Sequence, residues 1–144
     1  MLVSEILRIK GTVLFTTPPE APVMDAVKCM AHNDIGSLVV IDHGRVIGLV
    51  TFAEVLRALA ERGGTIGDLK ISAITERDPL TAAPSIDVNE LRRTMLDRHA
   101  RYVPVMDGST LLGVVSFHDV AKAVLEEQGL ENEMLKHYIQ DSPA

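Results

Sequence analysis

Residues 48–54 read GLVTFAE and residues 113–119 read GVVSFHD, and these two stretches decide the fold. Each is a short apolar run that ends on a hydroxyl residue, and a carboxylate follows three positions later. The hydroxyl and acid pairs are Thr51 with Glu54 and Ser116 with Asp119. This spacing is typical of the first turn of a helix, where hydroxyl and acid satisfy free main-chain amides. We therefore expect a strand that passes directly into a helix, twice in one chain.

The two stretches lie 65 residues apart, inside a longer internal repeat. From Thr16 onward the register holds without a gap and contains eleven identities in just over forty positions. The identical pairs are Thr16/Thr81, Pro19/Pro84, Val23/Val88, Met30/Met95, Val40/Val105, Asp42/Asp107, Gly48/Gly113, Val50/Val115, Phe52/Phe117, Val55/Val120 and Ala58/Ala123. Upstream, residues 3–6 match residues 66–69 at an offset of 63, which predicts a two-residue insertion or deletion before Thr16. We interpret the pattern as a duplication with pseudo-two-fold symmetry, in which two halves that are marginal alone share one core.

Both copies carry the same order of signals, β-α-β-β-α, which indicates an α/β (α+β) fold. Apolar residues at helical spacing predict the helices, and β-rich runs on either side of short polar turns predict the strands. The predicted helices cover residues 22–33, 52–62, 86–99 and 117–127, and the predicted strands cover residues 37–41, 46–50, 102–106 and 110–115. The strand runs are too continuously apolar for a half-exposed sheet, so we expect helices to cover them.

A further amphipathic segment spans residues 130–139, and Gly129 kinks it or separates it from the preceding helix. Its apolar stripe consists of Leu130, Met134, Leu135 and Tyr138. We expect this stripe to pack on its own domain or on a second copy, and a docking helix for another protein is the less favoured alternative. The predicted organisation is a first repeat over residues 1–62, a second repeat over residues 63–127, and a C-terminal helix and tail over residues 128–144.

The composition argues against several classes of protein. With 144 residues the chain is about one compact domain. Its net charge of −6 and its few aromatic residues, three Phe and two Tyr, argue against a nucleic-acid partner. The longest stretch without a charged residue, 108–118, is too short to span a membrane. The chain start lacks the features of a signal peptide and Cys29 is the single cysteine, so we expect a cytoplasmic protein.

The hydroxyl and acid pairs have two interpretations. In the first, Thr51 and Ser116 only cap the helices, and the acids bond back to the amides of the caps. In the second, the helix N-terminus and its hydroxyl attract a phosphate, while the carboxylate accepts both hydrogen bonds of a ribose diol. The two interpretations are compatible, because the same atoms can cap the helix when no ligand is bound. Cys29 and His32 lie three residues apart on a predicted helix, a spacing that fits one edge of a metal site, but no second pair accompanies them, so a core cysteine beside an ordinary histidine is favoured. The sequence contains no recognisable nucleophilic triad either, so we expect neither an enzyme nor a metal site.

Two paired blocks precede these motifs, IGSLVVID at residues 35–42 and ARYVPVMD at residues 100–107. The ordered set, found twice at fixed spacing over about residues 1–126, resembles a tandem pair of CBS domains. The resemblance implies two clefts between the copies for adenosine-type ligands: AMP, ADP, ATP, S-adenosylmethionine or NAD, with AMP or ATP favoured. It also implies that the hydroxyl faces phosphate and the acid binds ribose. The adenine would lie against the strand at residues 102–104 or 37–39.

The second copy is the favoured site, because it keeps the proline and aspartate of the family at Pro104 and Asp119. The first copy has Val39 and Glu54 instead, and the extra methylene of glutamate moves the carboxylate away from a bidentate geometry. Gly36 in the first copy leaves room for a ligand, where Arg101 could block it in the second. Cations gather around the second copy at Arg98, His99, Arg101, His118 and Lys122. The favoured site comprises Ser116, Asp119, Tyr102, Val103, Pro104, Arg101 and His118, and the weaker site comprises Thr51, Glu54, Gly36, Ser37, Leu38 and Val39.

The resemblance favours a regulatory, ligand-sensing module. Because the chain carries no catalytic or transport domain that it could regulate, we expect it to signal to a separate, unidentified partner protein. The alternative is a dimerisation or interaction scaffold whose nucleotide sites are vestigial. The resemblance further implies a homodimer, in which the helices of two chains form a flat disc. Neither a nucleic acid nor a membrane is an expected partner.

Overall fold

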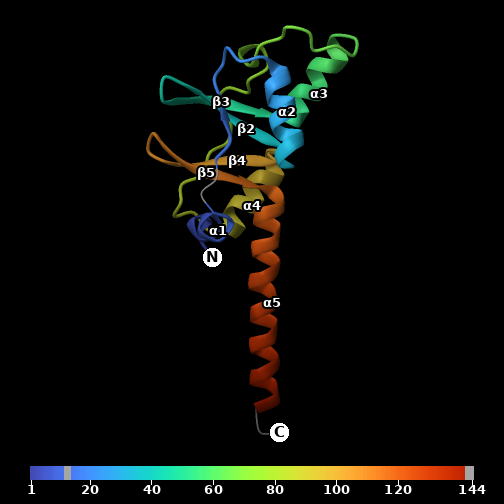
Figure 1. Cartoon of the computed structure of the whole chain (residues 1–144). Helices are drawn as coiled ribbons and strands as arrows, with labels where there is room; N and C mark the ends of the chain where they lie inside the picture. The colour runs from blue at the N-terminus through green and yellow to red at the C-terminus, as the bar shows by residue number, and fades with distance from the viewer. Residues whose placement is uncertain (12–13, 142–144) are drawn as a thin grey trace.

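The computed structural model describes residues 1–11 and 14–141 of the chain. Its elements are α1 (Val3–Lys10), β1 (Thr16–Thr17), α2 (Val23–Asn33), β2 (Ser37–Asp42), β3 (Arg45–Thr51), α3 (Phe52–Glu61), the 3-10 turn η1 (Ile71–Ala73), α4 (Val88–Asp97), β4 (Tyr102–Asp107), β5 (Thr110–Ser116) and α5 (Phe117–Asp141). Figure 1 shows two similar halves, one with the β2–β3 hairpin, α2 and α3, the other with the β4–β5 hairpin, α4 and the start of α5. The predicted strands and helices are confirmed up to residue 127, and their ends differ by at most two residues.

The two hairpins have the same register. β2 pairs antiparallel with β3 and β4 with β5, and both ladders shift register at the same place, after Val40 and after Val105. β1 adds a short parallel strand, with Thr17 opposite Val40, and Ala82 forms the equivalent single bridge opposite Val105. All these equivalent pairs are 65 residues apart. The repeat is therefore confirmed, although the first strand of the second copy is reduced to one bridge.

The segments that precede each repeat cross to the opposite half. The amide of Val3 donates to the carbonyl of Ile86 at 3.0 Å, and the amide of Ile71 donates to the carbonyl of Ala21 at 2.9 Å. Because Ala21 and Ile86 are equivalent in the repeat, Val3 is equivalent to Ile71, at an offset of 68. The predicted upstream offset of 63 is wrong, since it rested on a four-residue similarity that the main-chain hydrogen bonds do not follow.

Each half has its own hydrophobic core, and the crossing segments complete both. Val3 and Ile6 of α1 lie in the core of the second half, among residues of α4, β4, β5 and α5. Ile66 and Ile71 lie in the core of the first half, among residues of α2, β2, β3 and α3. The prediction that both halves share a single core is therefore wrong. The exchange of segments enlarges each core, which compensates for the small size of either half alone.

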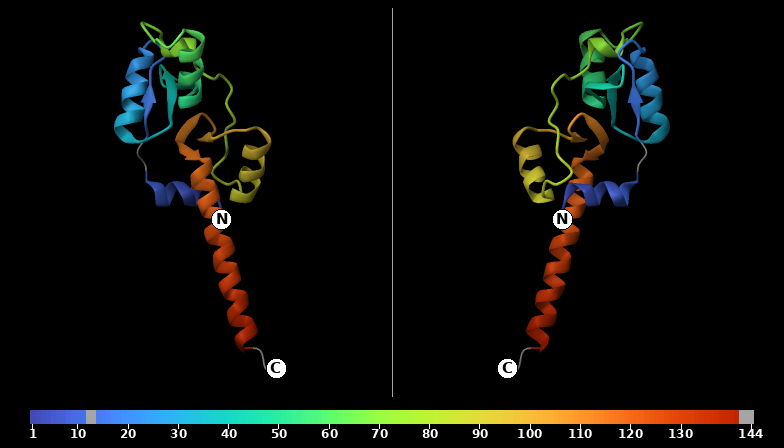
Figure 2. Two further views of the ribbon diagram at one scale, coloured as in Figure 1. Left: turned by 90° about the vertical axis from the view of Figure 1, so that its right-hand side faces the viewer. Right: turned by 90° about the vertical axis from the view of Figure 1, so that its left-hand side faces the viewer.

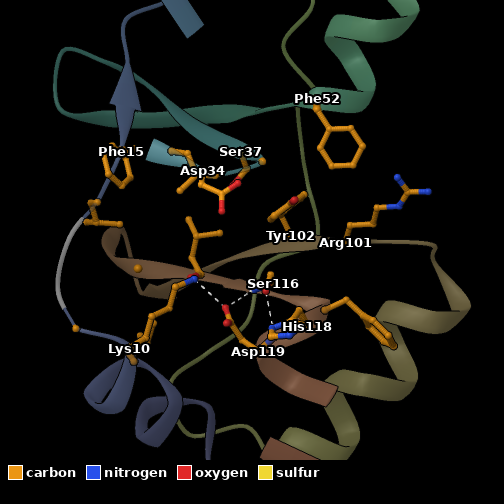
Figure 3. Close-up of a pocket in the computed structure, with 18 of the residues that line it drawn as sticks. Lys10, Phe15, Asp34, Ser37, Phe52, Arg101, Tyr102, Ser116, His118 and Asp119 are labelled. Atoms are coloured by element: carbon orange, nitrogen blue, oxygen red, sulfur yellow. Dashed lines mark hydrogen bonds and ion pairs between the residues drawn. The ribbon is translucent and has the colours of Figure 1, made fainter. Parts of the chain in front are cut away.

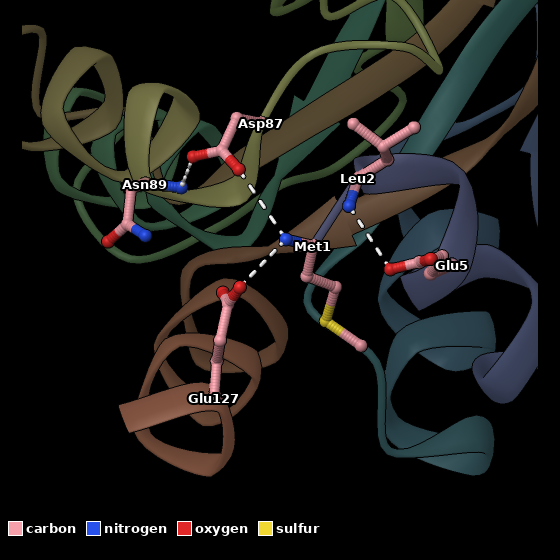
Figure 4. Close-up of polar contacts among 6 residues, drawn as sticks. All are labelled: Met1, Leu2, Glu5, Asp87, Asn89 and Glu127. Carbon is pink, nitrogen blue, oxygen red and sulfur yellow. Dashed lines mark hydrogen bonds and ion pairs between the residues drawn. The ribbon is translucent and has the colours of Figure 1, made fainter. Parts of the chain in front are cut away.

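The start of the chain is held between α4 and α5, as Figure 4 shows. The amino group of Met1 lies 3.0 Å from Glu127 Oε1 and 3.5 Å from Asp87 Oδ1. The other oxygen of Asp87 accepts a hydrogen bond from the amide of Asn89 at 2.9 Å and caps α4. The hydrogen bond to Glu127 raises the pKa of the Met1 amino group above its ordinary value. These contacts hold the beginning of α1 against the second half.

α5 runs without a break from Phe117 to Asp141, and its C-terminal part extends away from both halves (Figures 1 and 2). The predicted interruption at Gly129 is wrong. A side chain at Gly129 would meet no atom within 4 Å, so glycine costs only its low helix propensity, about 1 kcal/mol, which the helix-forming residues around it offset. None of the helices in the described residues combines the length and the apolar character that a membrane span requires.

The apolar stripe of this segment does not pack on the rest of the chain. Leu130, Met134 and Leu135 are exposed by 59%, 63% and 59% of their surface. The side chain of Tyr138 lies outside the described residues. The prediction that this stripe packs on its own domain is therefore wrong for Leu130, Met134 and Leu135. Packing of the stripe on a second copy stays a prediction.

The equivalent glycines Gly48 and Gly113 predict unequal costs of substitution. A methyl group at Gly48 would collide with the main-chain carbonyl of Glu76, whose segment bridges β3 at Leu49. At Gly113 the methyl group would meet the tip of the Leu7 side chain at 2.7 Å, which can rotate away. We expect Gly48→Ala to lower the free energy of unfolding by about 2–3 kcal/mol, and Gly113→Ala by about 1 kcal/mol or less. Urea unfolding measures both losses, and equal losses would contradict the packing of Glu76 on β3.

Candidate ligand-binding clefts

Two clefts lie between the halves, and each is lined by residues from both. The first, the Asp119 cleft, has a volume of about 590 Å³ and is lined by Asp119 and, from the other half, by Ser37. The second, the Glu54 cleft, has a volume of about 520 Å³ and is lined by Glu54 and, from the other half, by Arg98. Tyr102 lines both clefts. Both volumes fall within the range of small-molecule sites, roughly 300–1,000 Å³.

Asp119 lies on the first turn of α5 and forms a reciprocal capping box with Ser116 (Figure 3). The Ser116 hydroxyl accepts a hydrogen bond from the amide of Asp119 at 3.0 Å, and Asp119 Oδ2 accepts one from the amide of Ser116 at 2.9 Å. The same Oδ2 atom also accepts a hydrogen bond from Lys10 Nζ at 2.8 Å. The predicted cap is present, together with a cation to which no sequence motif points.

The Asp119 carboxyl is only 21% exposed, yet it favours the charged form. Burial raises the pKa of the Asp119 carboxyl, but the hydrogen bonds from Lys10 and Ser116 outweigh burial and bring the pKa below its ordinary value. At neutral pH the carboxylate is therefore charged. It offers lone pairs to hydroxyl or amine donors of a ligand.

The corresponding pair of the first copy has a different geometry. Thr51 Oγ1 accepts a hydrogen bond from the amide of Ala53 at 3.2 Å and caps α3. Glu54 Oε2 accepts a hydrogen bond from the Thr51 hydroxyl at 2.6 Å, and its Oε1 atom is buried without a partner among the described residues. The acid of this copy is thus bonded to the hydroxyl of the cap and not, as in the second copy, to its amide. Burial, and then the charge of Glu54, raise the pKa of the neighbouring Glu76 above its ordinary value.

An aromatic pair forms the wall between the clefts. The rings of Phe52 and Tyr102 meet edge to face, with centroids 6.2 Å apart and an interplanar angle of 88°. The Arg101 guanidinium lies 5.5 Å from the centroid of the Phe52 ring, a cation–π contact, so Arg101 is held at this wall (Figure 3). A side chain at Gly36 would collide with the Tyr102 hydroxyl. The room that we expected Gly36 to leave for a ligand is taken by Tyr102.

The structure groups the predicted site residues differently from the sequence. Gly36 and Ser37, expected beside Thr51 and Glu54, line the Asp119 cleft instead. Each cleft therefore combines the hydroxyl and acid pair of one copy with residues before or at the start of a strand in the other. The crossed arrangement follows from the packing of the two halves, since no local spacing relates these segments.

Four strand residues expected against the adenine are buried, and none of them is among the residues that line either cleft. These residues are Leu38, Val39, Val103 and Pro104. Leu38 belongs to the core of the first half and Val103 to the core of the second. At the rims of the clefts only the first residues of these strands, Ser37 and Tyr102, are available.

The cations expected around the second copy divide between the clefts. Arg101 lines both clefts and His118 lines the Asp119 cleft, whereas Arg98 and His99 line the Glu54 cleft. Lys122 lines neither. Within the part of the chain that the structure describes, no cluster of His, Cys, Asp or Glu is arranged to hold a metal ion.

Sequence reasoning missed several residues of the Asp119 cleft. Phe52 and Phe117 both line it, and their identity at equivalent positions of the repeat is a signal that could have identified them. Lys10 and Phe15 also line it, but both precede the part of the repeat that aligns without a gap. Lys10 reaches the cleft only because α1 crosses to the second half.

The chain is similar to several known proteins. The family model described as CBS domain matches it twice, over residues 3–61 and 71–126. A relative from Arabidopsis thaliana, CBS domain-containing protein CBSX3, mitochondrial, is 32% identical over 148 residues, which cover 96% of this chain and 71% of the relative.

Solved structures show the same likeness. A CBS-domain containing protein from Agrobacterium tumefaciens has a TM-score of 0.81 and 27% identity, and the match covers 85% of this chain and 98% of that protein. The CBS domain pair of protein MJ0100, solved in complex with 5′-methylthioadenosine and S-adenosyl-L-methionine, has a TM-score of 0.76 and 26% identity, with 88% and 98% of the two chains covered.

The contacts of Asp119 predict a pH-dependent contribution to stability. Because the pKa of Asp119 is lowered in the folded chain, its contribution is fully present above its unfolded value, near 3.8, and is lost as the pH falls through the folded value. We expect Asp119→Asn to lower the free energy of unfolding by about 0.5–1 kcal/mol at neutral pH. Urea unfolding of both proteins between about pH 7 and about pH 3 measures this difference, which should shrink at the acidic end. A difference that does not change with pH would argue against the charged contact.

Proposed function

Because the chain belongs to the family of CBS-domain proteins and carries a pair of these repeats, we propose that it is a regulatory module that binds an adenosine-type ligand in the Asp119 cleft. AMP and ATP are the ligands that we favour. A second, weaker site of the same kind lies in the Glu54 cleft, where the acid already accepts the Thr51 hydroxyl.

The composition of the Asp119 cleft carries the proposal, since its groups match the three parts of an adenosine nucleotide. Phe52 and Tyr102 offer aromatic surface for the adenine. The charged carboxylate of Asp119 accepts hydrogen bonds from ribose hydroxyls. Arg101 and His118 line the same cleft, as does Phe117 at the N-terminus of α5, and these groups would stabilise a phosphate.

A structural relative supports the class of ligand. The CBS domain pair of protein MJ0100 was solved with two adenosine derivatives. Adenine and ribose are common to these molecules and to AMP and ATP, so the shared part of the ligand is the part that aromatic surface and a carboxylate recognise.

The signal would travel through the relative placement of the halves and through α5. A ligand between the halves contacts both, and it can shift their arrangement only by its difference in affinity for the two arrangements. α5 begins in the Asp119 cleft at Phe117 and continues to the exposed residues Leu130, Met134 and Leu135. An output of this kind requires a separate partner protein, and the exposed part of α5 is the surface that we propose for it.

Substitution of the two acids tests the site. We expect Asp119→Ala to weaken AMP binding at least about tenfold, which corresponds to about 1.4 kcal/mol, because it removes the acceptor for the ribose. Glu54→Ala is the matched control in the other copy and should weaken binding less. Isothermal titration measures both affinities, and far-UV circular dichroism checks that both variants stay folded.

A thermal-shift panel with AMP, ADP, ATP, S-adenosylmethionine, NAD and GMP precedes these titrations. A ligand at about 100 times its Kd adds about 2.7 kcal/mol of stability, which corresponds to a shift of several degrees in the melting temperature of a domain of this size.

Two outcomes would change the proposal. In the titrations, a larger loss of affinity in Glu54→Ala than in Asp119→Ala would assign binding to the Glu54 cleft. A panel without any shift, from protein free of carried-over ligand, would favour an interaction scaffold with vestigial sites.

We also propose that the chain forms a homodimer through its helices. Leu56 of α3, Leu96 of α4 and Leu125 of α5 are exposed by 59%, 54% and 67%. Burial of such side chains drives association. We expect Leu125→Glu to convert a dimer to a monomer in size-exclusion chromatography with light scattering, whereas Ile9→Glu, at a 75% exposed position of α1, should leave it intact. A wild-type chain that is monomeric at tens of micromolar would contradict the proposal.

A further inference from the structure

Lys10 is the last residue of α1, and its side chain lies in the Asp119 cleft (Figure 3). Its Nζ atom donates to Asp119 Oδ2 at 2.8 Å and to the carbonyl oxygen of Val114 at 3.0 Å. The side chain is 44% exposed, so its ammonium group is within reach of a molecule in the cleft.

This contact uses an atom that a ribose would need. A carboxylate oxygen has two lone pairs, and Asp119 Oδ2 accepts one hydrogen bond from the Ser116 amide and one from Lys10. The Ser116 amide belongs to the capping box, so it cannot leave without opening the first turn of α5. A ribose diol that bonds to both carboxylate oxygens must therefore replace Lys10.

The fold does not require a cation at this position. In the first half, the residue equivalent to Lys10 is Asp78 by the offset of 68 that holds for α1, or Thr75 by the offset of 65 that holds for the strands. Neither is a cation. There the outer edge of β3 is bridged by the main chain of Glu76. Lys10 is thus particular to the Asp119 cleft.

A displaced Lys10 ammonium group stays close to the cleft. α1 is anchored by Val3 and Ile6 in the core of the second half, so the long side chain can move while the helix stays in place. The cleft also contains Arg101 and His118. The displaced group adds a further positive charge to a cleft that a phosphorylated ligand would enter.

We propose that Lys10 selects an adenosine ligand that carries a 5′-phosphate over adenosine itself. Lys10 competes with every ribose for Asp119, so it weakens the binding of all adenosine-type ligands. A phosphate compensates, because it pairs with the displaced ammonium group in a charge-assisted hydrogen bond. A neutral nucleoside has no group that does so. This inference rests on the proposed function, since it requires ribose to bind at Asp119.

Titration of Lys10→Met with AMP and with adenosine tests the inference. Methionine keeps an unbranched apolar side chain but removes the charge. We expect adenosine to bind about threefold tighter, because its competitor for Asp119 is gone, and the ratio of AMP affinity to adenosine affinity to fall at least about tenfold. Lys10→Arg should keep this ratio within about threefold of wild type, because a guanidinium also pairs with phosphate.

Lys122→Met is the matched control, since it removes a positive charge from α5 at a residue that lines neither cleft. Its affinity ratio should equal that of wild type. Urea unfolding of each variant separates a change of ligand selection from a general loss of stability.

Three results overturn the inference, and they differ in what they say of the proposed function. If wild type binds AMP and Lys10→Met keeps the wild-type affinity ratio, the proposed function stands and Lys10 only supports the edge of β5 through Val114. If wild type binds adenosine as tightly as its phosphorylated forms AMP and ATP, the selection by Lys10 fails and the proposed function stands. If wild type binds none of the adenosine-type ligands, both the proposed function and the selection by Lys10 fail.

Discussion

The main-chain hydrogen bond from Val3 to Ile86, and its equivalent in the other half, determine where the rest of the structure lies. They draw the segment in front of each repeat onto the opposite half, where it completes a core that the repeat alone would leave small. The same crossing brings α1 beside β5 and Lys10 to Asp119. The stability of the halves and the composition of the Asp119 cleft thus depend on one exchange of segments.

The repeat gives the molecule two clefts, and the acids of the two clefts have different hydrogen-bond partners. In the second copy the short side chain of Asp119 reaches the amide of Ser116, so it caps α5 and still presents a charged oxygen to the cleft. In the first copy Glu54 reaches the Thr51 hydroxyl instead, and its second oxygen is buried without a partner among the described residues. Equal backbones therefore carry unequal sites, because the two acids bond to different groups of their caps, a main-chain amide in one copy and a hydroxyl in the other.

For the regulatory function that we propose, two features connect a cleft with other parts of the molecule: the wall between the clefts and the length of α5. Tyr102 and Arg101 line both clefts, so a molecule that moves them in one cleft alters the other. α5 starts at the Asp119 cleft and ends beyond both halves, with apolar side chains exposed along it. The proposed signal depends on this continuity, because only an unbroken helix would carry a displacement of its first turn along its length.

The sequence by itself determined the repeat, its strands and helices, and the two hydroxyl and acid pairs. The repeat follows from identities 65 residues apart, and the other features depend on the spacing of neighbouring residues. Only the tertiary structure decided the upstream offset, the separate cores and the composition of each cleft. Lys10 and Asp119 are 109 residues apart, and Gly36 meets Tyr102 from the other half. Such contacts arise when distant segments pack on one another, and packing leaves no periodic signal in either segment. The unbroken helix through Gly129 has a different cause, since an exposed glycine with no neighbouring atoms strains nothing that would end the helix.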